Sequence, residues 1–289
     1  MKNIFIHIIK GAIMGAANVI PGVSGGTMAL VMGIYERLIN SINHLNFNTL
    51  KKIFITRDFK SFAKNTDLFF LISITVGIFV SIFSLSILLE FLFETHKILV
   101  LSYFFGLIFA SVFFVGKTIK KYSPLSIFLF LIGFLIAGGM VFISPSSSNS
   151  SFFFLIISGA IAMCSMILPG LSGSFVLLLL GNYELIICAI NDLNFSILVP
   201  FGIGAVSGII LFAKLLQFIF KKFRNNTISL LTGFIFGSLI ILWPWKLDDI
   251  NTNTFNYFIP NLNQETLIAF ALILLGALSV VMIEKYSKN

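Results

Sequence analysis

Two short segments of the chain combine residue types that bind anions with residue types that break helices. The first runs Asn18-Val-Ile-Pro-Gly-Val-Ser-Gly-Gly-Thr27 and the second Leu168-Pro-Gly-Leu-Ser-Gly-Ser174. Glycine lets backbone N–H groups curl around an oxyanion, and hydroxyl groups add further hydrogen bonds. The sequence therefore predicts a phosphate-binding site built from both segments. Its candidate residues are Asn18, Gly22, Ser24, Gly25, Gly26, Thr27, Gly170, Ser172, Gly173 and Ser174.

The two segments belong to two copies of one unit. Pro21 and Pro169 lie 148 residues apart, and a Gly-x-Tyr-Glu sequence follows each of them at the same distance. The tyrosines and glutamates of these sequences are Tyr35, Tyr183, Glu36 and Glu184. Farther along, the offset falls to 127, as between Gly106 and Gly233. A single copy would be better explained by close helix packing. Apolar halves that are interrupted at matching places favour a transporter with its binding site at the interruptions.

The composition requires a membrane. Hydrophobic residues make up 58% of the chain and charged residues 10%, and the mean hydropathy is +1.04, so too little polar surface exists to face water. An α-helix needs about 20 apolar residues to cross the hydrocarbon core. Suitable runs occupy 68–89, 98–116, 124–143, 196–220, 227–245 and 266–283.

The distribution of charge predicts the topology, because lysine and arginine are retained on the cytoplasmic side. Basic residues gather in 51–64, 117–121, 221–224 and 285–288, and acidic or neutral segments alternate with them at 90–94, 144–151, 192 and 248–265. This alternation places both termini in the cytoplasm. Three full crossings in each half invert the second half relative to the first. Residues 43–64, which only the first half contains, read as a basic amphipathic helix on the inner leaflet or as a solvated loop.

The motif segments themselves are short for a crossing. A helix of about 15 residues before each break spans roughly 22 Å. We therefore expect re-entrant hairpins at 4–42 and 152–190 whose tips meet near the midplane, although charge alone is equally compatible with full crossings. The predicted fold is an all-α polytopic membrane protein with two inverted-topology repeats, each a re-entrant helical hairpin plus three transmembrane helices. The repeats cover 1–143 and 152–289, and an external linker at 144–151 joins them.

Charged residues next to the motifs have two interpretations. Charges inside a membrane are costly and usually functional. Glu36 and Glu184, at matching positions, are either carboxylates that reach the interface or groups that take up and release protons during transport. Arg37 has no basic counterpart, since Leu185 occupies that place. It is expected to pair with Glu36 or to hold a phosphate on the cytoplasmic side.

Several other functions lack the residues they need. Gly-x-Ser-Gly matches intramembrane serine proteases, but the histidines, His7, His44 and His96, do not lie in a late apolar helix that would supply a base. Cys164 and Cys188 lie in apolar stretches and are expected to be packing residues. No enzyme activity, metal, cofactor or nucleic-acid partner is predicted, and the sequence makes no prediction about oligomers.

Both motifs, with Gly33-Ile-Tyr-Glu36 and Gly181-Asn-Tyr-Glu184, resemble the signatures of the bacterial polyprenyl-phosphate transporter family, the undecaprenyl-phosphate translocases of the PopT type. The resemblance spans nearly the whole chain. It implies a flippase in the bacterial plasma (inner) membrane that returns undecaprenyl phosphate from the outer to the cytoplasmic leaflet, where peptidoglycan and cell-envelope synthesis reuse this lipid carrier. A channel or exchanger for small anions remains the alternative from the residues themselves.

Overall fold

The computed structural model describes residues 2–20, 22–45, 49, 59–249 and 254–287. The first half contains α1 (Lys2–Val19), α2 (Gly25–Val31), α3 (Tyr35–His44), α5 (Phe59–Asn65), α6 (Leu68–Gly116), α7 (Pro124–Gly139) and the 3-10 turn η1 (Met140–Phe142). The second half contains α8 (Phe152–Ile167), α9 (Gly173–Leu179), α10 (Tyr183–Asn191), α11 (Phe195–Leu242), β1 (Lys246–Asp249), β2 (Thr254–Tyr257) and α12 (Gln264–Ser287). The prediction of an all-α polytopic membrane protein is confirmed.

Four of the described helices are long and apolar enough to cross a membrane: α6, α7 with its 3-10 extension, α11 and α12. The pair α9 and α10, bent by 109°, would count as a fifth if it forms one span. Helices α1 and α8 are apolar but shorter. The chain is therefore a multi-pass membrane protein. The two predicted hairpins correspond to the helices α1 to α3 and α8 to α10.

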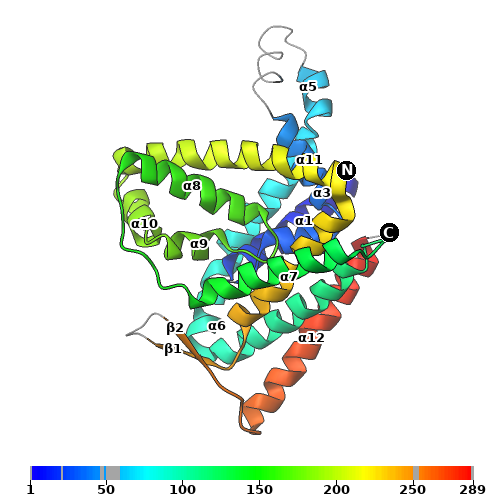
Figure 1. Ribbon diagram of the computed structural model, residues 1–289, viewed down its shortest axis with the longest axis vertical. Helices are drawn as coiled ribbons and strands as arrows, with labels where there is room; N and C mark the ends of the chain where they lie inside the picture. The colour runs from blue at the N-terminus through cyan, green and yellow to red at the C-terminus, as the bar shows by residue number, and fades with distance from the viewer. Residues whose placement is uncertain (1, 21, 46–48, 50–58, 250–253, 288–289) are drawn as a thin grey trace.

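The helices α6 and α11 each hold two of the apolar spans that the sequence predicts. They have 49 and 48 residues, so each would be more than about 70 Å long if straight, over twice the thickness of the hydrocarbon core. Each is interrupted by one residue with non-helical backbone angles, His96 (φ −140°, ψ 45°) in α6 and Phe223 (φ −134°, ψ 45°) in α11. Figure 1 shows α11 turning at this break. The two breaks are 127 residues apart, the offset found in the sequence.

Matching helices make matching contacts in the two halves. α1 packs along α6 and α8 along α11, as Figure 1 shows for α8 (green) beside the first part of α11 (yellow). Gly11 lies against the backbone of Ile74, and the corresponding Gly159 lies against the backbone of Phe201. A Cβ atom at either glycine would collide with a carbonyl oxygen, so both halves use glycine for the same close approach. The inversion of one half relative to the other stays a prediction.

One element was not expected from the sequence. The strands β1 and β2 form an antiparallel hairpin in which Lys246 pairs with Tyr257. Helix α11 ends at Leu242 rather than at 245, because Pro244 lacks a backbone N–H and disfavours helical angles in the residue before it. Of the predicted amphipathic segment 43–64, residues 46–48 and 50–58 lie outside the described part of the chain.

Candidate functional site

The two motif segments meet in the structure. We call 18–27 the first tip and 167–174 the second tip. Two hydrogen bonds join the tips directly, and a third joins the second tip to the Tyr35 side chain at the start of α3. The bonds run from Ser24 Oγ to Leu168 O (3.1 Å), from the Gly170 N–H to Thr27 Oγ1 (3.0 Å) and from the Tyr35 hydroxyl to Ile167 O (3.1 Å). Segments 148 residues apart in the sequence therefore form one continuous polar junction. Pro21 lies outside the described residues, whereas Pro169 is buried.

Side chains of the first tip cap the N-terminus of α2. The first N–H groups of α2 have no partner within the helix, and Asn18 Oδ1 accepts a hydrogen bond from the Gly25 N–H (2.7 Å) while Ser24 Oγ accepts one from the Gly26 N–H (3.2 Å). Ser24 and Thr27 are 2% and 0% exposed. These candidate phosphate ligands are thus engaged within the protein in this structure. The Asn18 side chain is half-buried, and only its oxygen is used by this cap.

The second tip is more open. Ser172 precedes α9 but makes no capping hydrogen bond to it, and its hydroxyl lies 2.8 Å from that of Ser174, which is exposed. The N–H groups of Gly173 and Ser174 have no hydrogen-bond partner among the described residues. The second tip therefore leaves hydroxyl and N–H groups free for a ligand, whereas the first tip leaves the side-chain N–H₂ group of Asn18.

The first glycine of each motif has a packing role. Gly22 and Gly170 have φ of +84° and +77°, a backbone conformation that side chains rarely tolerate. Both are buried against the second part of α11. A Cβ atom at Gly170 would lie 2.5 Å from the carbonyl carbon of Phe234, and one at Gly22 would lie 2.9 Å from Ile241 Cγ2. These glycines therefore hold the tips against α11.

A cavity of about 560 Å³ begins at the first tip. Asn18, Gly25 and Gly26 form its polar end, and the remaining wall is almost entirely apolar side chains from α1, α3, α6, α8 and α11. Thr75 and Met166, which also belong to the wall, are exposed at the surface of the protein. The cavity therefore suits a ligand with one polar end and a long apolar body.

The charged residues near the tips pair differently from the prediction. Arg37 does not pair with Glu36; its guanidinium donates to both carboxylate oxygens of Asp67 at 2.6 and 3.1 Å. Glu36 instead accepts from Arg224 of α11 at 2.9 Å. Glu184 is exposed and has no partner among the described residues. Sequence reasoning assigned Arg224 to a basic loop between two spans and missed its contact with the motif, because an interruption between spans does not indicate which distant helix packs against it.

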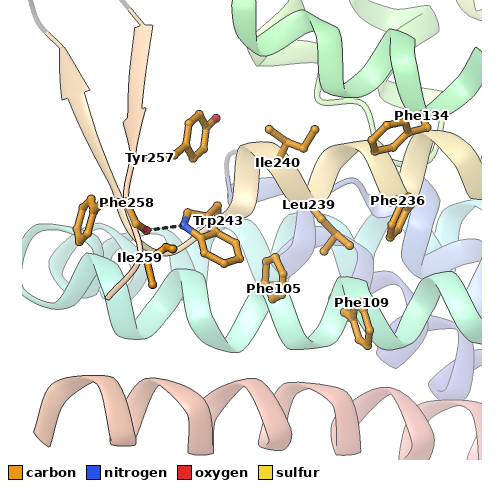
Figure 2. Close-up of a pocket in the computed structure, with 10 residues that line it drawn as sticks. All are labelled: Phe105, Phe109, Phe134, Phe236, Leu239, Ile240, Trp243, Tyr257, Phe258 and Ile259. Atoms are coloured by element: carbon orange, nitrogen blue, oxygen red, sulfur yellow. Dashed lines mark hydrogen bonds between the residues drawn. The ribbon is translucent and has the colours of Figure 1, made fainter. Parts of the chain in front are cut away.

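A second cavity, of about 460 Å³, is lined mainly by aromatic side chains of α6, α7, α11 and the end of β2 (Figure 2). The indole N–H of Trp243 donates to Phe258 O at 3.3 Å, the dashed line of Figure 2, and burial raises the pKa of Tyr257 to about 12. Phe236 and Ile240 lie on the opposite helical face of α11 from Phe234 and the tips. This cavity is therefore separate from the candidate site.

Comparisons with known proteins agree on one family. The family model VCA0040-like, described as undecaprenyl phosphate translocase-like, matches residues 14–259. A polyprenyl-phosphate transporter of Vibrio cholerae serotype O1 is 40% identical over 245 residues, which cover 84% of this chain and 79% of that protein. A polyprenyl-phosphate transporter of Staphylococcus aureus is 33% identical over 258 residues, 83% and 86% of the two chains. These names describe transporters rather than enzymes. No solved structure matches the chain.

Proposed function

Because the chain belongs to the undecaprenyl phosphate translocase-like family, we propose that this multi-pass membrane transporter carries polyprenyl phosphate from the outer to the cytoplasmic leaflet of the bacterial plasma membrane. The substrate has an isoprenoid chain and a phosphate headgroup, and its return makes the carrier available for another round of cell-envelope synthesis. Both relatives are named polyprenyl-phosphate transporters, which supports this substrate class. Both termini face the cytoplasm in this proposal, as the charge distribution predicts.

The cavity at the first tip is the observation that carries the proposal. Its apolar wall would accept part of an isoprenoid chain, and its polar end, formed by Asn18, Gly25 and Gly26, would face the headgroup. Backbone that is not helical is tolerated at membrane depth only beside protein or a wet cavity. A small hydrophilic anion would gain nothing from an apolar wall of this extent. The shape therefore favours an amphiphilic substrate over the small-anion alternative.

The headgroup would bind between the two tips. Asn18 supplies a side-chain N–H₂ group at the cavity, because only its oxygen caps α2. On the other side, the N–H groups of Gly173 and Ser174 and the hydroxyls of Ser172 and Ser174 have capacity for an oxyanion. The hydroxyls of Ser24 and Thr27 would join them only if the contacts between the tips rearrange during transport. The buried glycines of the first tip would bring backbone close to the phosphate.

Transport of a charged headgroup needs a driving force if the lipid is to accumulate inside. Moving a negative charge inward against the membrane potential costs about 2.3 kcal/mol per 100 mV. Glu36 and Glu184 are the candidates for proton coupling, because they occupy matching positions and are partly or fully exposed. In this proposal Glu36 exchanges its ion pair with Arg224 for a proton during the cycle, which links protonation to movement of α3.

The test is translocation in reconstituted vesicles. In vesicles that contain the purified protein, a labelled polyprenyl phosphate placed in one leaflet should reach the other leaflet faster than it does in vesicles without protein. The same vesicles should retain trapped inorganic phosphate. Release of phosphate without translocation of the lipid would replace the proposal with a small-anion pathway. Vesicles that do neither would also contradict it, provided that the protein is folded and inserted.

A further inference from the structure

The strongest asymmetry of the structure lies between α3 and its counterpart α10. Helix α3 is bound to α11 close to the break at Phe223. Glu36 accepts a hydrogen bond from Arg224 at 2.9 Å, and the ring of Tyr35 lies 5.8 Å from that of Phe220. Gln217 adds two amide contacts, donating to Asn40 Oδ1 at 2.7 Å and accepting from Asn43. We call this set of interactions the α3–α11 contact.

Helix α10 lacks an equivalent contact. It packs on α9 and on α11 of its own half, and does not pack substantially on α6, the counterpart of α11 in the other half. Tyr183 is 38% exposed, whereas the corresponding Tyr35 is 1% exposed. Glu184 has no ion pair with any described residue, whereas Glu36 has one. The interface between the two halves is thus closed at α3, which packs on the long helix of the other half, and open at α10, which does not.

The sequence offsets name the residues that would close the open side. The offset of 148 relates α3 to α10, and the offset of 127 relates α11 to α6. The second offset also relates the two helix breaks, Phe223 and His96, which share nearly the same backbone angles. It pairs Arg224 with Lys97, the residue directly after the break in α6, and it pairs Phe220 with Phe93.

The chemistry of the contact is preserved by this correspondence. On α10 the tyrosine and the glutamate recur as Tyr183 and Glu184, and on α6 the aromatic and basic residues recur as Phe93 and Lys97. The amide cluster is preserved only in part, because Gln217 corresponds to Glu90, Asn40 to Cys188 and Asn43 to Asn191. The residue types for an ion pair and an aromatic contact therefore recur in the second half, while the contact between Gln217 and Asn40 is particular to the first.

We propose that Glu184 and Lys97 form an ion pair when α10 closes on α6, and that this pair alternates with Glu36–Arg224 during transport. The proposal rests on the proposed transport function. Two halves of similar structure can exchange conformations, so that each adopts the arrangement now seen in the other. A solvent-exposed ion pair stabilises its state only weakly, which suits a contact that must open in every cycle. By the predicted topology, Glu36–Arg224 closes the cytoplasmic side and Glu184–Lys97 the external side.

The first test is disulfide cross-linking in membranes, in a background in which Cys164 and Cys188 are replaced by alanine. The pair Tyr35→Cys with Phe220→Cys should cross-link, because these rings are already adjacent. The pair Tyr183→Cys with Phe93→Cys should cross-link as well, once the protein samples the other state. Each cross-link should lower transport below that of the same double-cysteine variant in its reduced form, which serves as the baseline. Formation of the first cross-link but not of the second would overturn the proposal.

The second test reverses the charges. Measured without a proton gradient, so that proton coupling does not contribute, Glu184→Lys or Lys97→Glu alone should slow transport about threefold to tenfold, because each change removes an attraction and adds a repulsion. The double variant should recover most of the loss, and Glu36→Arg with Arg224→Glu serves as the control on the observed pair. A double variant as slow as the single ones would overturn the ion pair. Cross-linking does not require substrate, so a protein that cross-links at both pairs but moves no polyprenyl phosphate would refute the proposed function and not this contact.

Discussion

Replacement of Asn18 by aspartate separates the structural role of this residue from its proposed role in binding. The cap on α2 uses the side-chain oxygen, which accepts from the Gly25 N–H at 2.7 Å. Aspartate retains an oxygen at that position, and a negative charge is favourable beside a helix N-terminus. The amide N–H₂ group, which borders the cavity, is replaced by a second carboxylate oxygen. Asn18→Asp should therefore leave the tip folded and make it repel phosphate.

The expected loss follows from two effects. A hydrogen bond to a charged group contributes about 1.5 to 3 kcal/mol. Two unit charges about 4 Å apart repel by about 4 kcal/mol at an effective dielectric constant of 20, the value typical near a protein surface. Since about 1.4 kcal/mol is a factor of ten, Asn18→Asp should weaken binding of polyprenyl phosphate at least about a thousandfold. Translocation in vesicles should become undetectable at substrate concentrations that saturate the wild type.

Two measurements make this prediction refutable. The amount of protein in the membrane and its thermal stability without substrate should match the wild type, and stabilisation by added substrate should disappear. Asn261→Asp introduces the same chemical change at an exposed position before α12 and should behave as the wild type. Translocation by Asn18→Asp at the wild-type rate, with the control equally active, would show that Asn18 is not near the headgroup.

Three further predictions concern the tips, the topology and the coupling. Thr27→Val removes the hydroxyl that accepts from the Gly170 N–H and leaves this buried N–H unpaired, which should destabilise the fold by about 1 to 3 kcal/mol and lower the thermal unfolding temperature of the purified protein. An unchanged temperature would show that this bond does not join the tips. In a background without native cysteines, a cysteine at Lys120 should be shielded from an impermeant external label and one at Ser147 should react; labelling at Lys120 would overturn the inverted topology. An inward proton gradient should accelerate translocation, and Glu36→Gln or Glu184→Gln should remove that response; two glutamine variants that respond fully would leave passive translocation as the better account.

The features that the sequence predicted well depend on local chemistry. Helix breakers and long apolar runs act over a few residues, so composition indicated the breaks before Gly25 and Gly173 and the membrane class itself. The meeting of the tips followed from the duplication, because matching interruptions in two packed halves tend to line one site. The hydrogen bond between Thr27 and Gly170 agrees with that expectation.

Other features depend on contacts between distant segments. The apolar runs predicted an interruption at 90–97 and another at 221–226, and each helix break falls within one of them. The break in α6 falls at His96 and that in α11 at Phe223, and neither is a glycine or a proline. Long apolar stretches with one polar interruption predict two spans but not the angle between them. The partner of Glu36 was missed for the same reason, since Arg224 follows the break and is 188 residues away in the chain. Pro244 was a usable signal for the end of α11, and the strands after it were too short to be recognised by alternation.

The two tips differ in residue type as well as in conformation: Met166 and Phe175 stand where the first tip has Asn18 and Thr27, so the second tip has neither the side-chain cap nor the bonded hydroxyl of the first. Tyr35 and Tyr183 occupy matching places, yet one is buried and hydrogen-bonded across the junction while the other is exposed. In the proposed cycle the site closes from either side, and the position of α3 or α10 relative to the long helix of the other half would decide which side is closed. Two such states must lie within a few kcal/mol of each other for the protein to alternate between them. A free-energy difference that small cannot be read from residue types, so the sequence did not indicate which of α3 and α10 packs on the long helix of the other half.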